Sequence, residues 1–344
     1  MQIFIRSALA LVASAVTLIP GAHANGEVNL YSYRQPFLIQ PMLDAFTEET
    51  GIKVNIVFAK KGMLQKIKAA GANNPADAVL TVDIGRLDAL AEAQLLEPIE
   101  SETLQKHVPS HLRHPDGLWF GLTTRARVVL ASKDRVADGE IANLSDLIEP
   151  RFKGRVCTRS GKHVYNVGLL AAMIAHDGEA ATQAWLAGLK ANLARKPQGN
   201  DRAQAKAIYE GVCDVAITNH YYMGKMATAT KKPEQRKWAD AVKVVFTDQD
   251  GHGQHLNLSG AGVLKNAKNR DNAIKMLEFL VSEKAQKMYA QDNFEYPVRE
   301  GIALHPMLES WGTFKPDTLS LEKIARNRTT ASKIVDKVNF DAGP

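Results

Sequence analysis

Cysteine is scarce in this chain, whose 344 residues include only Cys157 and Cys213. Two thiols without CxxC spacing do not make a zinc site, so a cysteine-bound metal is not expected. In an oxidising compartment such a pair can form one disulfide, which typically stabilises a fold by roughly 2–4 kcal/mol. Two buried free thiols are the alternative that the sequence leaves open.

Long hydrophobic runs are missing after the first 24 residues. The chain begins with the short basic segment Met1–Arg6, continues with the apolar segment Ala8–Ile19, and reaches the small-x-small sequence Ala22-His23-Ala24. This order is typical of a secretory signal peptide, which we expect to be residues 1–24. The apolar segment is too short for a good membrane span, and no later one approaches about 18 apolar residues. The mature chain is therefore expected outside the cytoplasm, without a membrane span.

A strong excess of one charge and the familiar enzyme motifs are also absent. The formal net charge is +6, and it is spread in short clusters such as Lys60-Lys61 and Lys231-Lys232, which are typical of a solvated surface. We therefore expect no nucleic-acid partner. The sequence contains no GxSxG, HExxH, P-loop or GxGxxG segment, and no arrangement of a nucleophile with a base. These absences argue against an enzyme.

Alternating strands and helices predict an α/β fold. The first strands are expected at 27–32, 53–58 and 78–82, and the first helices at 36–50, 63–70 and 87–93. This alternation indicates a mostly parallel sheet with helices on both faces. A second α/β series opens at Val156, and the extended runs 117–130 and 244–264 have the character of crossings between two units. We expect two lobes joined by two crossing strands, with a hinged cleft that closes around a ligand.

The length of the chain also favours two domains. We expect the N-terminal lobe to comprise residues 25–125 and 249–299, and the C-terminal lobe to comprise residues 126–248 and 300–344.

Tyrosines follow several of the predicted strands. Tyr221 and Tyr222 come directly after the buried strand 213–218, Tyr165 begins the helix after the Cys157 strand, and Tyr33 ends the first strand. The carboxyl ends of strands are where open α/β sheets bind ligands, so these phenols are expected to share one cleft. Fe3+ prefers oxygen donors and can hold phenolates ionised at neutral pH, and three phenolates would neutralise it. The alternative is that they are ordinary half-buried aromatic residues.

Four segments resemble the periplasmic ferric-iron-binding proteins of bacterial ABC transporters. They are the sequences NLYSYR at 29–34, LTTRAR at 122–127, NLARKPQGNDR at 192–202 and NHYY at 219–222. The resemblance covers essentially the whole mature chain. It implies a type II periplasmic-binding fold with two mixed sheets and flanking helices, and iron ligands at Tyr165, Tyr221 and Tyr222. It also implies a monomeric periplasmic protein that carries Fe3+ to an inner-membrane ABC permease.

One position departs from the family pattern. Many relatives supply a His or another Tyr just after the arginine of the opening segment, where this chain has Gln35-Pro36. The ligand on the side of the N-terminal lobe is therefore open. It could be Tyr33, an exogenous anion such as carbonate, or a water, or there could be none.

Four further residues are candidates for holding an anion or for a place behind the ligands. They are Arg34, Arg125, Arg127 and Asn166. Guanidinium groups suit both tasks because they can hold an anion or stabilise a neighbouring phenolate.

Two other functions are left open by the sequence. The same fold could bind an organic or anionic solute, such as a polyamine, thiamine or a phosphonate. A polyamine site needs several cleft carboxylates, in which the segments named above are poor, whereas a phosphonate would use the arginines without the tyrosines. A secreted hydrolase is the alternative from another class of protein.

Overall fold

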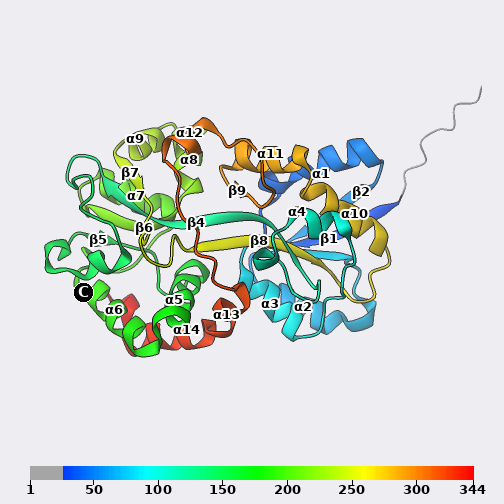
Figure 1. Ribbon diagram of the computed structural model, residues 1–344, viewed down its shortest axis with the longest axis horizontal. Helices are drawn as coiled ribbons and strands as arrows, with labels where there is room; N and C mark the ends of the chain where they lie inside the picture. Colours follow the sequence, from blue (N-terminus) through cyan, green and yellow to red (C-terminus); the bar gives the residue numbers. More distant parts are fainter. Residues whose placement is uncertain (1–25) are drawn as a thin grey trace, which may run out of the picture.

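The computed structural model describes residues 26–344, and the expected signal peptide at 1–24 lies outside the described residues. The described residues form one mixed sheet with the strand order β2-β1-β3-β8-β4-β6-β5, and β7 and β9 also pair with β4. Helices flank this sheet on both faces (Figure 1). The strands are β1 (Glu27–Ser32), β2 (Lys53–Phe58), β3 (Ala78–Thr81), β4 (Phe120–Ser132), β5 (Val156–Cys157), β6 (Val215–Asn219), β7 (Val242–Val245), β8 (Leu256–Val263) and β9 (Tyr296–Pro297).

The helices follow most of the predicted segments. The α-helices are α1 (Pro36–Thr50), α2 (Met63–Ala70), α3 (Ile84–Glu92), α4 (Glu102–His107), α5 (Val164–Asp177), α6 (Glu179–Ala191), α7 (Asp201–Tyr209), α8 (Tyr221–Ala227), α9 (Glu234–Asp240), α10 (Arg270–Leu280), α11 (Glu283–Asn293), α12 (Pro306–Ser310), α13 (Leu321–Arg326) and α14 (Arg328–Lys337). Short 3-10 helices lie at Gly71–Asn73, Ser110–Leu112, Leu144–Ile148, Pro150–Phe152 and Phe340–Ala342. The sequence does not predict α4, α9 or α12, because helices this short show little hydrophobic periodicity.

The first strands build one side of the molecule, here called the β1–β3 side. Strand β1 pairs in parallel with both β2 and β3, as the alternation of strands and helices predicts. Helix α1 shows why the segments fold locally. Pro36 stands in its first turn, where a missing N–H costs nothing, and Gly51 ends it in the left-handed conformation at φ 73°. Ile39, Met42, Leu43 and Phe46 of this helix are buried in the core, whereas Phe37 is exposed.

Strand β4 connects this side to the rest of the sheet. Its 13 residues are all buried, which is why it appears in the sequence as one long apolar run. Its first half pairs with β8, with Thr124 opposite Leu258, and its second half pairs with β6 and β7. Figure 1 shows β4 and β8 passing through the middle of the molecule between two groups of elements. They are the two crossing strands predicted from the sequence, and the two half-sheets are continuous through β4.

The later strands build the opposite side, here called the β5–β7 side. Strand β5 runs parallel to β6, with Val156 opposite Val215, so the carboxyl ends of both strands point the same way. A disulfide joins Cys157 of β5 to Cys213, just before β6, with the two Cα atoms 5.9 Å apart. Two neighbouring strands that carry the candidate tyrosines at their ends are therefore covalently linked.

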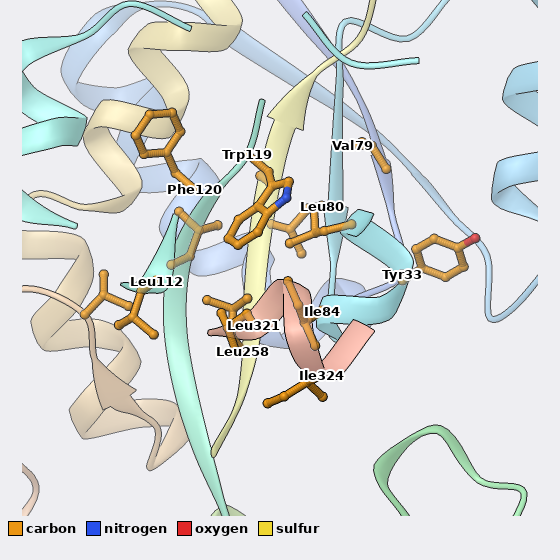
Figure 2. Packing of buried hydrophobic residues seen from close by; sticks show 14 of the residues in the cluster. Tyr33, Val79, Leu80, Ile84, Leu112, Trp119, Phe120, Leu258, Leu321 and Ile324 are labelled. Carbon is orange, nitrogen blue, oxygen red and sulfur yellow. The ribbon is translucent and has the colours of Figure 1, made fainter. Parts of the chain in front are cut away.

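The C-terminal segment touches both sides. The single helix expected at 321–339 is divided at Asn327 into α13 and α14. Helix α13 packs against α3 and α5. Figure 2 shows Leu321 and Ile324 of this helix beside Leu258 of β8 and Ile84 of α3. The division into two lobes at the residues given above stays a prediction, because this helix belongs to the packing of both sides.

Candidate metal centre

A cleft of about 460 Å³ lies between the two sides. The β1–β3 side contributes Tyr33, Arg34, Gln35, Phe37, Leu38, Phe58, Lys60 and Val82. The β5–β7 side contributes Arg159, His163, Tyr165, Asn200, Arg202, Tyr221, Tyr222 and Lys225, and Arg125 and Glu295 complete the lining. Most of these residues lie at the end of a strand or in the loop that follows it. This is the edge of the sheet at which parallel strands are expected to bind a ligand.

Three phenol groups meet on the β5–β7 wall of the cleft. Tyr221 and Tyr222 open helix α8 directly after β6, and Tyr165 is the second residue of α5, in the segment that follows β5. The rings of Tyr221 and Tyr222 stack with their centroids 4.2 Å apart. All three tyrosines line the same cleft, so the structure brings together the three residues that the sequence nominated.

The surroundings keep the paired phenols neutral. Burial raises the pKa of Tyr221 well above its ordinary value, and the neighbouring Tyr165 and Tyr222 raise it further. Burial also raises the pKa of Tyr222. Desolvation penalises a phenolate that has no counter-charge, whereas a bound trivalent cation would reverse the preference. Among residues 26–344, no group of three or more His, Cys, Asp or Glu side chains could hold a metal ion. A metal in this cleft therefore depends on the tyrosines.

Tyr33 lies at the cleft but uses its hydroxyl elsewhere. The hydroxyl oxygen accepts a hydrogen bond from the backbone N–H of Leu64, at 3.3 Å, in the first turn of α2. The guanidinium of Arg86 lies over its ring, 4.2 Å from the centroid. Figure 2 shows the hydroxyl pointing away from the labelled core residues. The hydroxyl oxygen of Tyr33 therefore faces the start of α2. Gln35, which follows the opening segment 29–34, is another polar side chain of this wall that lines the cleft.

Two of the nominated arginines line the cleft, and they differ in whether their charge is paired with a carboxylate. Arg34 is buried and donates to Glu295 at 3.0 Å and to the Ser259 hydroxyl at 3.1 Å, so its charge is paired. Arg125 is also buried and donates to the carbonyl oxygen of Val82 at 2.7 Å. In the part of the chain that the structure describes, Arg125 has no carboxylate partner in an ion pair and its Nε has no hydrogen-bond partner. Its positive charge is therefore available to an anion in the cleft.

The other two nominated residues lie behind the tyrosines. Arg127 and Asn166 are not part of the cleft lining. Arg127 donates to Asp201 at 2.6 Å, to the Asn219 side-chain oxygen at 3.1 Å and to the Asn166 side-chain oxygen at 2.6 Å. Because both terminal nitrogens of Arg127 donate to these buried groups, and the Asn166 oxygen accepts one of the bonds, neither residue is placed to hold an anion in the cleft.

Several lining residues were not identified from the sequence. Arg159 and His163 could have been found, because they lie in the same segment after β5 as Tyr165. His163 accepts from the backbone N–H of Tyr165 at 3.3 Å and its ring meets the Tyr165 ring edge-on at 4.5 Å. Burial, with help from Arg159, lowers the pKa of His163 to about 3, so this side chain is neutral. Glu295 and Lys60 carry no comparable sequence signal.

The two walls differ in chemistry. The β5–β7 wall offers three phenol oxygens together with Arg159, Arg202 and Lys225. The β1–β3 wall with Arg125 offers further positive charge and no free carboxylate, since Glu295 is paired with Arg34. Such a cleft suits a hard cation on one wall and an anion on the other. Two α/β halves joined by two crossing strands around a ligand cleft define a solute-binding protein of the hinged kind. The chain belongs to the bacterial extracellular solute-binding protein family, which it matches over residues 31–287.

Relatives of known name agree with this class. The chain is 45% identical over 315 residues to iron uptake protein A1 of Synechocystis sp., covering 91% of this chain and 87% of the relative. It is 52% identical to the apo ferric ion-binding protein A of Pasteurella haemolytica, whose crystal structure it matches with a TM-score of 0.87 over 92% of this chain and 98% of the other. A Trichodesmium protein (FutA) solved with iron and citrate ligands is 41% identical, with a TM-score of 0.87 and coverage of 92% and 100%. The resemblance and the fold class predicted from the sequence are confirmed.

Proposed function

We propose that this protein captures Fe3+ in the cleft through the phenolates of Tyr165, Tyr221 and Tyr222. The observation that carries the proposal is the meeting of three phenol groups on one wall of a cleft. Three phenolates balance the charge of Fe3+, and this ion prefers such oxygen donors. The names of the relatives, which include an iron uptake protein and a ferric ion-binding protein, support the same cargo.

An anion from solution completes the coordination. The Tyr33 hydroxyl oxygen accepts a hydrogen bond from the start of α2, and Gln35 is a weak ligand for Fe3+. The described residues of the β1–β3 wall therefore provide no strong protein ligand. Arg125, which forms no ion pair with a carboxylate among the described residues, supplies positive charge there. A small anion such as carbonate fits between the metal and this guanidinium, with Arg34 as a second, already paired neighbour.

The biological role that follows is transport without catalysis. A solute-binding protein of this family delivers its cargo to an inner-membrane ABC permease, and the expected signal peptide directs the chain to the periplasm. No helix among residues 26–344 has the length and apolar character that crossing a membrane requires. We infer that the mature chain acts as a monomer.

An organic cation is a poorer cargo for this cleft. Of the described residues that line it, Glu295 is the only carboxylate, and it already pairs with Arg34 at 3.0 Å. A polyamine or thiamine would bring positive charge to a cleft that contains Arg125, Arg202 and Lys225 without matching negative charge.

Titration of the purified mature chain with Fe3+ in bicarbonate buffer tests the proposal. Phenolate coordination should produce a charge-transfer band in the visible spectrum. Tyr165→Phe, Tyr221→Phe and Tyr222→Phe each remove one ligand, so each should weaken the band and the binding. Tyr209→Phe, at an exposed tyrosine on α7, is the matched control and should leave both unchanged. Absence of the band in the parent protein, or a band that the three cleft variants leave intact, would contradict the proposal.

A further inference from the structure

Asp201, the first residue of α7, is a buried carboxylate outside the cleft lining. Its side chain has an exposed fraction of 0%. Oδ1 accepts from Arg127 at 2.6 Å and from the backbone N–H of Asn219 at 3.0 Å. Oδ2 accepts from Arg159. One carboxylate therefore joins three segments: β4 through Arg127, the end of β6 through Asn219, and the loop after β5 through Arg159.

One of these contacts controls the tyrosine pair. Asn219 is the last residue of β6, and Tyr221 follows two residues later. The backbone N–H of Asn219 donates to Asp201, and the side-chain oxygen of Asn219 accepts from Arg127 at 3.1 Å. The place where the strand ends and α8 begins is thus fixed from two directions, and with it the direction in which the two phenols leave the backbone.

A second chain of contacts reaches Tyr165. Arg127 donates to the side-chain oxygen of Asn166, the residue after Tyr165, at 2.6 Å. The Asn166 amide in turn donates to the Thr158 hydroxyl at 3.2 Å and to the backbone oxygens of Arg159 and Ser160, both at 3.1 Å. The first turn of α5 and the loop before it are therefore held together.

The two arginines also approach Tyr165 directly. The guanidinium carbons of Arg159 and Arg127 lie 5.3 Å and 5.8 Å from the centroid of its ring. Asp201 fixes where both guanidinium groups stand, so its carboxylate bears on the position of the Tyr165 ring as well as on its backbone.

The charges explain why this arrangement is stable although it is buried. Burial alone would raise the pKa of Asp201, but the positive charges of Arg127 and Arg159 and the N–H of Asn219 lower it overall. The carboxylate is therefore ionised, and its charge is offset by two guanidinium groups. A buried ion pair of this kind adds little net stability compared with apolar packing, and its attested use is to specify one arrangement.

We infer that Asp201 is a positioning residue for the ferric site, which holds Tyr165 and the pair Tyr221–Tyr222 in one arrangement before the metal arrives. The inference rests on the proposed function. We call Asp201, Arg127, Arg159, Asn166 and Asn219 the Asp201 cluster. Groups that orient metal ligands from behind typically change metal affinity by about 10–100-fold when they are altered.

The chain offers a matched control at the other end of the same strand. Asp214 precedes β6, and its two carboxylate oxygens accept from Arg135 and Arg155. It is therefore also a carboxylate clamped by two arginines and attached to β6, with an exposed fraction of 17%. Asp214 is not part of the cleft lining. Its loss should affect stability without reaching the tyrosines.

The experiment compares Asp201→Asn with Asp214→Asn in the mature chain. Each ferric protein is mixed with an excess of a competing chelator, and the loss of the visible charge-transfer band gives the rate of iron release. We expect Asp201→Asn to release iron about 10–100-fold faster and to shift the band maximum, because the phenolates are no longer held in one geometry. We expect Asp214→Asn to stay within about twofold of the parent rate, with an unmoved band, although its Tm falls.

A second variant covers the case in which Asp201→Asn does not fold, which circular dichroism of the apo protein would reveal. Arg127→Lys keeps the charge, but one ammonium group cannot contact Asp201, Asn166 and Asn219 together. It should also release iron faster and shift the band. If the parent shows no ferric band, the proposed function fails. If the parent shows the band and the folded cluster variants behave like Asp214→Asn, the positioning role of Asp201 is wrong while the ferric site stands.

Discussion

The acid stability of the apo protein should depend on one buried histidine next to the tyrosine pair. His220 has an exposed fraction of 0% and links three segments. Its Nδ1 accepts from the backbone N–H of Ala126 at 3.0 Å, its Nε2 lies 2.8 Å from the carbonyl oxygen of Phe294, and its ring stacks on Tyr296 at 4.6 Å. Since Nδ1 accepts, Nε2 carries the single proton and donates it to Phe294. The neutral imidazole thus satisfies both of its nitrogens. A second proton, on Nδ1, would face the Ala126 N–H, with the Ala126 carbonyl oxygen 3.3 Å away as its acceptor.

The size of the effect follows from the pKa. Burial lowers the pKa of His220 from 6.5 to about 4, against smaller opposing contributions from Ala126 and Glu295. Between these two values the unfolded chain binds a proton that the folded chain does not, so the folded state loses stability as the pH falls. The contribution of neutral His220 to the free energy of unfolding is complete well above pH 6.5. It is lost as the pH falls to about 4, where the loss reaches about 3 kcal/mol. Between pH 7.5 and pH 5.5 it is about 1.3 kcal/mol.

Urea unfolding of the apo protein at pH 7.5 and pH 5.5 measures this contribution. His220→Gln keeps an amide donor near Phe294 but does not titrate, so its loss of unfolding free energy between the two pH values should be smaller than that of the parent by about 1.3 kcal/mol. His255, whose pKa is also lowered to about 4 by burial, stays in both proteins and cancels in the comparison. His111→Gln, at an exposed histidine, is the control and should keep the parent pH dependence. A His220→Gln protein with the same pH dependence as the parent would refute the reasoning.

Two further predictions concern the disulfide and the anion. Replacing both Cys157 and Cys213 by Ala opens a covalent loop with a sequence separation of 56, which should lower the free energy of unfolding by about 4 kcal/mol in urea titrations, and a loss below about 1 kcal/mol would contradict this. Arg125→Gln removes a positive charge that lines the cleft, so ferric binding should lose most of its dependence on bicarbonate concentration while the charge-transfer band persists. The same dependence in this variant and the parent would exclude Arg125 as the anion partner. Arg236→Gln, at a surface arginine outside the cleft lining, is the matched control.

Local sequence patterns were sufficient for most of the elements. The segments of the β1–β3 side alternate strongly enough that β1, α1, β2 and α2 have the predicted bounds. The helix expected at 87–93 instead begins at Ile84, whose side chain packs inward with the core. The break at Asn327 between α13 and α14 was not visible, because apolar positions continue on both sides of it.

The site residues that come just after strands could be predicted from the sequence, whereas those whose role depends on tertiary packing could not. Tyr165, Tyr221 and Tyr222 could be grouped because parallel strands present their carboxyl ends at one edge. Arg127 was nominated either for an anion or for a place behind the ligands, and only the tertiary structure, in which it lies opposite Asn219 and donates to Asp201, puts it behind the cleft. The role of Glu295 could not be foreseen, because its partner Arg34 is 261 residues away in the sequence.

All three phenols come from one side of the molecule, from segments that a disulfide and a buried carboxylate already join. If the two sides were to swing apart, this set of oxygens would not be divided, and Arg159 and Arg202 would stay with it, whereas Arg34 of the facing wall would be withdrawn. Iron would therefore remain seated in an open protein after its anion has left. Unloading at the membrane would then require a chemical trigger, such as protonation, reduction or a stronger chelator, in addition to the movement of the hinge.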